Sequence, residues 1–211
     1  MLDESPRICC IGFQKTGTTS LAEALERLGY AVTNINRDVD AALSTPTDDP
    51  QAVADRIAIE ALKSHHVIQD SPAAFVFQAL DRAYPGSKFI LTYRPVDKWL
   101  KSYEKFFPDE NNALRRWMYG VDRFSGNEAR YRQVYESQNA AIRSYFADRP
   151  QDFMEMDLSG GAGWYDLVNF LGPDLLPRFP HANIGGSKRQ TRQYGTGSKT
   201  LARRLLKRLA D

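Results

Sequence analysis

The chain has 211 residues, a length that suits one domain of moderate size. Hydrophobic residues make up 42% of it and charged residues 26%, which is ordinary for a soluble globular protein. No apolar run approaches the roughly 18 residues of a membrane-spanning helix. The first ten residues also lack the apolar segment of a signal peptide. We therefore expect no membrane span and a cytoplasmic location.

Strand-like and helix-like segments alternate along the chain, which is the order of an α/β protein. The segment 88–93 is the most apolar strand and suits the buried centre of a parallel sheet. The pattern predicts a three-layer fold with a central, mainly parallel sheet flanked by helices. The predicted strands are 7–13, 31–34, 66–69, 88–93 and 152–156; the predicted helices are 18–29, 50–64, 72–84, 95–105, 163–170 and 200–209, with a further helical region at 111–147.

Two segments are predicted to be loops. The segment 36–49 is polar and contains Pro46, and the segment 185–198 holds four of the chain's 14 glycines. We expect a single domain over residues 1–211, in which about 185–211 form a basic loop and a C-terminal helix.

Charge is distributed unevenly along the chain. The segment 188–211 carries eight basic residues and one acidic residue, a net charge of +7, which leaves −5 for the rest of a chain whose total is +2. Such a segment can serve an anionic ligand, nucleic acid or a membrane surface, or it can be a solvated amphipathic helix. Because no recognised nucleic-acid-binding motif is present, we expect no nucleic-acid partner.

The two cysteines, Cys9 and Cys10, are adjacent within a predicted strand. Successive side chains of a strand point to opposite faces, so these thiols cannot share a site. We expect both to be small core residues rather than metal ligands or a disulfide.

The most informative segment is 12–21, GFQKTGTTSL, which follows the apolar run 8–11. A buried strand that enters a glycine-bearing loop and then a helix forms a phosphate cradle, because backbone N–H groups and the helix N-terminus attract anions. Nucleotide triphosphatases use GxxxxGK[ST] for this purpose. Gly12 and Gly17 have that spacing, but Thr18 replaces the lysine, and the lysine is Lys15 instead. The sequence thus predicts a P-loop-like fold that binds phosphate in a different way from an ATPase.

A second candidate anion site follows the strand 88–93. Arg94 stands at the carboxyl end of this strand, where ligands of open α/β sheets bind. Ser102 lies eight residues later on the next helix, a rise of roughly 12 Å, so a long arginine and a short hydroxyl could meet at one anion. Alone, such a pair is usually a surface arginine and an incidental serine; together with the Lys15 loop it favours an anion site.

With these motifs the chain resembles the sulfotransferases that use 3′-phosphoadenosine 5′-phosphosulfate (PAPS). The segment Lys15–Thr19 matches their phosphate-loop signature, in a form most similar to heparan-type members, and Arg94 with Ser102 matches their second signature. The segments 170–172 (FLG) and 179–183 (FPHAN) are typical of small bacterial members. The resemblance spans about 7–183.

The resemblance implies that the loop holds the 5′ end of PAPS and that Lys15 also neutralises charge on the departing oxygen. Arg94 and Ser102 would hold the 3′ phosphate, for which the planar arginine fork is suited. Transfer would be in-line, metal-independent and aided mainly by positioning and electrostatics. A basic loop containing Lys188 and Arg189 would close over the 3′ phosphate, unless this segment is disordered. The cofactor-binding residues expected are Lys15, Thr16, Gly17, Thr18, Thr19, Ser20, Arg94, Ser102, Lys188 and Arg189.

A general base should take the proton of the acceptor, and the resemblance places it near the end of the strand 66–69. One alignment puts Gln69 at the position of the family's base, and another puts Asp70 there. Asp70 is our candidate. Its alternative role is to cap the helix that begins near Pro72. His65 and His66 are reserves.

The resemblance implies an acceptor hydroxyl or amine on a small molecule or carbohydrate that the sequence does not identify. The family contains monomers and dimers, so a homodimer is compatible with the resemblance. Small-molecule sulfotransferases stack adenine on a tryptophan where this chain has Ser20, so the adenine partner is another, unassigned residue. The aromatic residues of 111–147 could line an acceptor pocket, but their helical spacing favours the core.

Two other functions remain open from the sequence. A P-loop nucleotide or small-molecule kinase would need Mg²⁺ and normally a lysine after Gly17, which is absent. A non-enzymatic protein that binds anions or nucleic acid through its basic end would bind with a steep dependence on salt.

Overall fold

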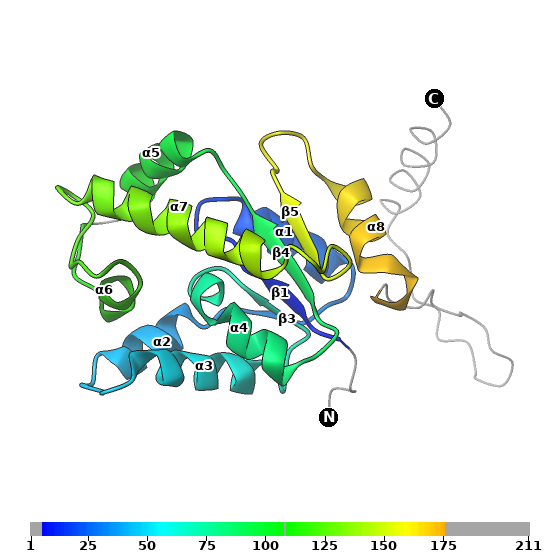
Figure 1. Cartoon of the computed structure of the whole chain (residues 1–211), viewed down its shortest axis with the longest axis horizontal. Coiled ribbons are helices and arrows are strands. Elements are labelled where there is room, and N and C mark those ends of the chain that lie inside the picture. The colour runs from blue at the N-terminus through cyan, green and yellow to red at the C-terminus, as the bar shows by residue number, and fades with distance from the viewer. Residues whose placement is uncertain (1–5, 108, 176–211) are drawn as a thin grey trace, which may run out of the picture. The chain divides into compact units, whose positions relative to one another are not determined.

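The computed structural model describes residues 6–107 and 109–175 (Figure 1). Contacts divide the chain into the units 1–177 and 178–211, and the described residues all belong to the first. The predictions for Lys188 and Arg189, the loop 185–198 and the helix 200–209 lie outside the described residues. The single domain over 1–211 stays a prediction.

Five strands form one sheet in the order β2-β3-β1-β4-β5. Every pairing between them is parallel, with Cys9 of β1 opposite Ile68 of β3 on one side and Phe89 of β4 on the other. The predicted central, mainly parallel sheet is therefore confirmed. The strands are β1 (Ile8–Cys10), β2 (Val32–Thr33), β3 (Val67–Gln69), β4 (Lys88–Thr92) and β5 (Phe153–Met156).

Helices cover both faces of the sheet and so make the three predicted layers (Figure 1). One face packs against α1 and α8, and the other against a larger group led by α3, α4, α5 and α7. The helices are α1 (Thr18–Arg27), α2 (Asn36–Leu43), α3 (Pro50–Ala61), α4 (Ala73–Ala83), α5 (Val96–Phe106), α6 (Ala113–Tyr119), α7 (Glu128–Tyr145) and α8 (Trp164–Leu175), the last broken at Gly172.

The two cysteines occupy opposite faces of β1, as predicted. Cys9 belongs to the larger hydrophobic cluster and Cys10 to the smaller one, and both are fully buried free thiols. Burial raises the pKa of the Cys10 thiol far above its ordinary value. Both cysteines are therefore inert core residues.

The prediction of a loop over 36–49 was wrong for its first half, where α2 covers Asn36–Leu43. The helix buries only Val39, so its apolar stripe was too short for a periodicity signal. Packing against α3 and α6 stabilises it instead, and the Asp40 carboxylate accepts a hydrogen bond of 3.0 Å from the backbone N–H of Leu114. Pro46 lies beyond the end of α2 and does not interrupt it.

The aromatic residues of the middle region belong to the core. Tyr119 and Tyr131 are fully buried, and their rings stack with centroids 3.8 Å apart. Tyr135 stacks on Trp99 at 4.2 Å. The prediction of core packing rather than an acceptor pocket is confirmed for these tyrosines, because none of them lines the cavity described below.

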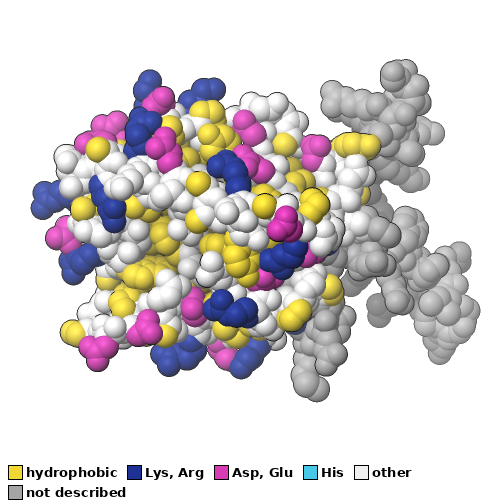
Figure 2. Space-filling model, viewed as in Figure 1, with side chains coloured by type: hydrophobic (Ala, Val, Ile, Leu, Met, Phe, Trp, Pro, Cys, Tyr) yellow, Lys and Arg dark blue, Asp and Glu magenta, His cyan; other side chains and the backbone are white. Residues whose placement is uncertain are grey.

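Charges of both signs are interspersed over the face of the molecule shown in Figure 2. No single-sign patch covers that face of the described part.

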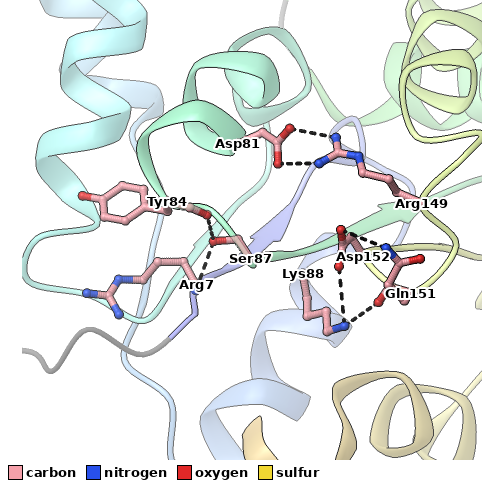
Figure 3. A network of polar contacts seen from close by, with 8 residues as sticks. All are labelled: Arg7, Asp81, Tyr84, Ser87, Lys88, Arg149, Gln151 and Asp152. Atoms are coloured by element: carbon pink, nitrogen blue, oxygen red, sulfur yellow. Dashed lines mark hydrogen bonds and ion pairs between the residues drawn. The ribbon is translucent and has the colours of Figure 1, made fainter.

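A polar network closes the amino edge of the sheet (Figure 3). Arg149, which precedes β5, donates two hydrogen bonds of 3.1 and 2.7 Å to the carboxylate of Asp81 on α4. Lys88 at the start of β4 contacts both Gln151 and Asp152. These contacts tie α4 and the chain before β5 to the end of the sheet that faces away from the carboxyl ends of the strands.

Burial opposes ionisation of Asp81, but hydrogen bonds from Arg149 and Tyr145 outweigh it and lower the pKa of the carboxyl. A lowered pKa in the folded state gives stability that is present above the ordinary aspartate pKa of about 3.9 and is lost as the pH falls through the lowered value. We predict that Asp81→Asn lowers the free energy of unfolding by about 1.5–3 kcal/mol at neutral pH. Urea denaturation at several pH values measures this difference in the free energy of unfolding. The difference should disappear in acid, where Asp81 is protonated.

The matched control is Asp122→Asn, because the Arg116–Asp122 pair is mostly exposed, with side chains at 60% and 53%. This change should cost less than about 1 kcal/mol. Equal losses for the two variants would contradict the role given to the Asp81 network.

Candidate active site

A cavity of about 670 Å³ lies at the carboxyl edge of the sheet. We call it the edge cavity. The segments that follow all five strands contribute to it, and so do α1 and α5. Its lining residues are Gln14, Lys15, Thr16, Gly17, Thr18, Thr19, Ser20, Asn36, Asp70, Tyr93, Arg94, Ser102, Phe106, Phe107, Leu158 and Ser159.

The edge cavity unites the site residues predicted from the described part of the sequence. The segment 15–20 lines it from β1 and α1, Asp70 from the end of β3, and Arg94 with Ser102 from β4 and α5. Residues up to 87 positions apart in the chain thus share one space, as the edge rule for α/β sheets predicts.

The loop after β1 has the geometry of a phosphate cradle. Gly17 adopts φ 106° and precedes the first turn of α1, whose N-terminus has no side-chain cap and no acidic residue. The backbone N–H groups there and the helix dipole remain available to an anion. The positive φ of Gly17 favours glycine, and a Cβ there would lie 2.5 Å from Leu158 Cδ1, so the Leu158 side chain would have to shift.

Hydrogen bonds anchor this loop to β4 and to the aromatic core. The Thr16 hydroxyl donates to Phe13 O at 2.5 Å, so the Thr92 hydroxyl, 2.6 Å away, must donate to it. The indole Nε1 of Trp99 donates to Gln14 O at 2.8 Å. The loop is therefore fixed before any ligand arrives.

Arg94 is held at both its backbone and its side chain. The Tyr135 hydroxyl accepts from Arg94 N at 3.2 Å and donates to Arg94 O at 2.7 Å. The guanidinium Nη1 donates to Lys15 O at 3.0 Å. This contact uses one of the five N–H groups of the guanidinium and places the positive charge beside the loop.

The ammonium of Lys15 lies over the ring of Phe106, 3.3 Å from the ring centroid. Phe106 is 64% exposed, so the lysine packs on an aromatic ring that is open to solvent. A cation–π contact of this exposed kind is worth only about 0.5–1 kcal/mol, which an anionic ligand can exceed.

Asp70 is partly buried at the end of β3. Burial raises the pKa of its carboxyl, while hydrogen bonds from Ser71 N–H and the Asn36 side chain and the nearby charge of Lys15 oppose that rise. Asp70 and Lys15 have φ 70° and 69°, and they are the non-glycine residues with positive φ in the described ranges. Such strained positions concentrate at functional sites.

The alternative role of Asp70 as a helix cap is not what the structure shows. The N-cap of α4 is Pro72, and no side chain caps this helix. The Asp70 Oδ1 atom accepts instead from the adjacent Ser71 N at 2.7 Å.

The other candidates for a base lie away from the edge cavity. His66 precedes β3 at the amino edge of the sheet, where its Nδ1 accepts a hydrogen bond of 3.1 Å from Ala31 N. His65 Nδ1 lies 3.0 Å from Ala61 O. Gln69 ends β3 but does not line the cavity, and its side-chain oxygen is buried without a hydrogen-bond partner among the described residues.

Sequence reasoning missed several lining residues, chiefly Asn36, Tyr93, Phe106 and Leu158. Asn36 follows β2 and Leu158 follows β5. The carboxyl-edge rule that selected Arg94 would have found both if it had been applied to every strand. Phe106, at the end of α5, carried no comparable signal.

A family model described as the sulfotransferase domain matches residues 7–187. Because this match covers most of the 211 residues, the chain belongs to the sulfotransferase family. Membership supports sulfotransfer as the activity and marks the protein as a transferase enzyme.

Among solved structures, shikimate kinase from Acinetobacter baumannii in complex with shikimate is similar, with 13% sequence identity and a TM-score of 0.36 over 69% of this chain and 95% of that chain. A score this low supports no inference about activity. No curated protein sequence matches this chain significantly.

The described ranges, 6–107 and 109–175, hold neither a metal-ligand cluster nor a membrane-spanning helix. No group of three or more His, Cys, Asp and Glu side chains there could hold a metal ion. No helix there has the length and hydropathy needed to cross a bilayer.

The loop tolerates no side chain at Gly12. An added Cβ would lie 1.9 Å from Thr92 Oγ1 and 2.7 Å from Thr92 O, so backbone as well as side chain would have to move. We predict that Gly12→Ala lowers the free energy of unfolding by at least about 1–3 kcal/mol, measured by urea denaturation. It should also weaken binding of inorganic pyrophosphate. Gly163→Ala, whose added carbon would meet nothing within 4 Å, is the control. Equal stability of both variants would contradict the close approach.

Proposed function

We propose that this protein is a PAPS-dependent sulfotransferase, which moves a sulfuryl group from PAPS to a hydroxyl or amine of a small-molecule or carbohydrate acceptor. One observation carries the proposal: the Lys15 loop and the Arg94–Ser102 pair line the same cavity. A donor with a 5′ phosphosulfate and a separate 3′ phosphate needs two such anion sites, whereas ATP needs only one.

The residues of the edge cavity fit this donor. Gly12 lets the loop lie close against Thr92, and the uncapped N-terminus of α1 presents N–H donors. Lys15 and Arg94 supply positive charge, and Asp70 is the acidic residue among the lining side chains. The loop would hold the 5′ end, with hydroxyls from Thr18 and Thr19. Arg94 and Ser102 would hold the 3′ phosphate.

PAPS, when bound, supplies a sulfuryl group activated by its bond to a phosphate. The Lys15 ammonium and the N–H groups at the start of α1 would neutralise the charge that grows on the departing phosphate oxygen. To reach this oxygen, the Lys15 ammonium would give up its cation–π contact with the exposed ring of Phe106. The anchored loop keeps these donors in place, so little reorganisation is needed during transfer.

Asp70 would accept the proton of the acceptor at its Oδ2 atom, since Oδ1 already accepts from Ser71 N. A raised pKa makes the carboxylate a stronger base. A smaller cavity of about 170 Å³, lined by Asn36, Ser71 and Phe107 among others, shares Gln14, Asn36 and Phe107 with the edge cavity. The acceptor would approach Asp70 from this cavity, whose wall includes the adjacent Ser71. A cytoplasmic location and a homodimer stay predictions.

We predict that 3′-phosphoadenosine 5′-phosphate (PAP), the product of PAPS, binds more tightly than ADP without a divalent metal. Arg94→Ala should remove at least about 1.5 kcal/mol of PAP affinity, about tenfold, because a charge-assisted hydrogen bond to phosphate is lost. Its effect on ADP should be small. Isothermal calorimetry measures all of these affinities.

Arg56→Ala, on the exposed side of α3 and away from the cavity, is the matched control and should bind PAP as the wild type does. ADP binding equal to or stronger than PAP binding, or a requirement for Mg²⁺, would overturn the sulfotransferase proposal in favour of a P-loop kinase.

We predict that Asp70→Asn lowers kcat by about 10²- to 10⁴-fold while PAP affinity stays near the wild-type value. Turnover of PAPS is measured with an acceptor found in a panel of small hydroxyl compounds and carbohydrates. In the wild type, activity should fall as the pH drops through the raised pKa of Asp70.

The same variant has a stability signature of opposite sign. An aspartate with a raised pKa binds more protons when folded, so stability falls as the pH rises from about 3.9 through that pKa. Asp70→Asn should therefore have a higher free energy of unfolding than the wild type at neutral pH. Below about pH 3.9 the two proteins should be equally stable. Asp38→Asn, at an exposed position of α2, controls for the change in net charge. Unchanged turnover in Asp70→Asn would remove Asp70 from the mechanism.

A further inference from the structure

A second cavity adjoins the edge cavity on the side of α1. It has a volume of about 220 Å³ and lies between α1, the end of β5 and the start of α8. We call it the annex. Apolar side chains form most of its wall, among them Leu21, Ala24, Met156, Leu158, Trp164 and Leu167.

Trp164 is the unusual member of this wall. It is 44% exposed, and its indole has no ring contact or hydrogen bond with any part of the chain that the structure describes. Of the three tryptophans in the sequence, Trp99 is fully buried against Tyr135, and Trp117 packs against Phe75. A large aromatic ring left open at the wall of an apolar cavity offers a stacking surface to a ligand.

The annex and the edge cavity are neighbours with a shared wall. Ser20 and Leu158 line both of them. Leu158 packs so closely on Gly17 that an added Cβ would lie 2.5 Å from its Cδ1. The annex therefore begins directly beside the phosphate loop, and a ligand with its phosphates at the start of α1 can extend into it past Ser20.

The two cavities differ in chemistry as the two ends of a nucleotide do. The edge cavity offers cations, hydroxyls and a helix N-terminus. The annex offers mainly aliphatic side chains and an indole, with Glu23 and Arg27 of α1 also in its wall. The volumes of the two cavities are about 670 and 220 Å³. Their combined volume lies within the range of small-molecule sites, about 300–1,000 Å³.

We propose that the annex binds the purine base of the nucleotide donor and that Trp164 stacks on it. This inference rests on the proposed function, since it takes the donor's phosphates to occupy the edge cavity. It assigns the base-binding surface to α8 and to the segment after β5. The stacking would contribute affinity for the base without taking part in sulfuryl transfer.

The test compares two probes, PAP and inorganic pyrophosphate, which has no base. We predict that Trp164→Ala weakens PAP about tenfold, as expected for one base stacked on one aromatic ring. Pyrophosphate affinity should be unchanged. Trp164→Phe should retain most of the PAP affinity, because a phenyl ring also offers a π face. PAP should quench the fluorescence of the exposed Trp164, so the quenching should vanish in both variants.

The matched control is Tyr165→Ala, which removes an adjacent ring that is 72% exposed and does not line the annex. It should bind PAP as the wild type does. Calorimetry gives the affinities, and thermal unfolding shows whether each variant is folded.

Two results would overturn the inference while leaving the proposed function intact: wild-type PAP affinity in Trp164→Ala, or an equal loss for PAP and pyrophosphate. Failure of the wild type to bind PAP at all, with pyrophosphate still bound, would instead overturn the PAPS proposal, and the inference with it.

Discussion

The close approach of the loop after β1 to β4 is the constraint on which the site depends. Gly12 leaves no room for a Cβ against Thr92, and the same Thr92 hydroxyl forms a hydrogen bond of 2.6 Å with the Thr16 hydroxyl. Arg94, two residues further on, reaches back to Lys15 O at 3.0 Å. Because β1 and β4 are neighbours in the sheet, these contacts fix the two proposed anion sites relative to each other. A donor with two phosphate groups could then bind without rearranging the backbone.

The aromatic core gives this edge its rigidity. Trp99 and Tyr135 stack on each other, and each also bonds to the backbone of the site, Trp99 to Gln14 O and Tyr135 to both backbone groups of Arg94. Packing energy from large buried rings therefore stabilises the positions of polar groups at the cavity. The positive φ values of Lys15 and Asp70 cost conformational energy, and this surrounding structure is what can sustain them.

Two partly buried aspartates, one at each edge of the sheet, have pKa values shifted in opposite directions. At the amino edge Asp81 has a lowered pKa, because Arg149 and Tyr145 satisfy its carboxylate despite burial. At the carboxyl edge Asp70 has a raised pKa, because burial there outweighs its few hydrogen bonds. The first arrangement favours stability and the second favours a base. This contrast follows from the partners of each carboxylate, since the residue type is the same.

The sequence by itself determined the alternation of strands and helices, the phosphate-loop motif at Lys15 and the arginine at the end of β4, because these signals are local in the chain. It did not reveal α2, whose single buried residue, Val39, leaves no periodic pattern, so contacts with other helices decide its structure. The tertiary structure placed Asp70 and the histidines at opposite ends of β3, as the predicted strand 66–69 implied. It alone brought Trp164 beside Ser20, 144 positions earlier, since such proximity depends on how the helices pack across the sheet.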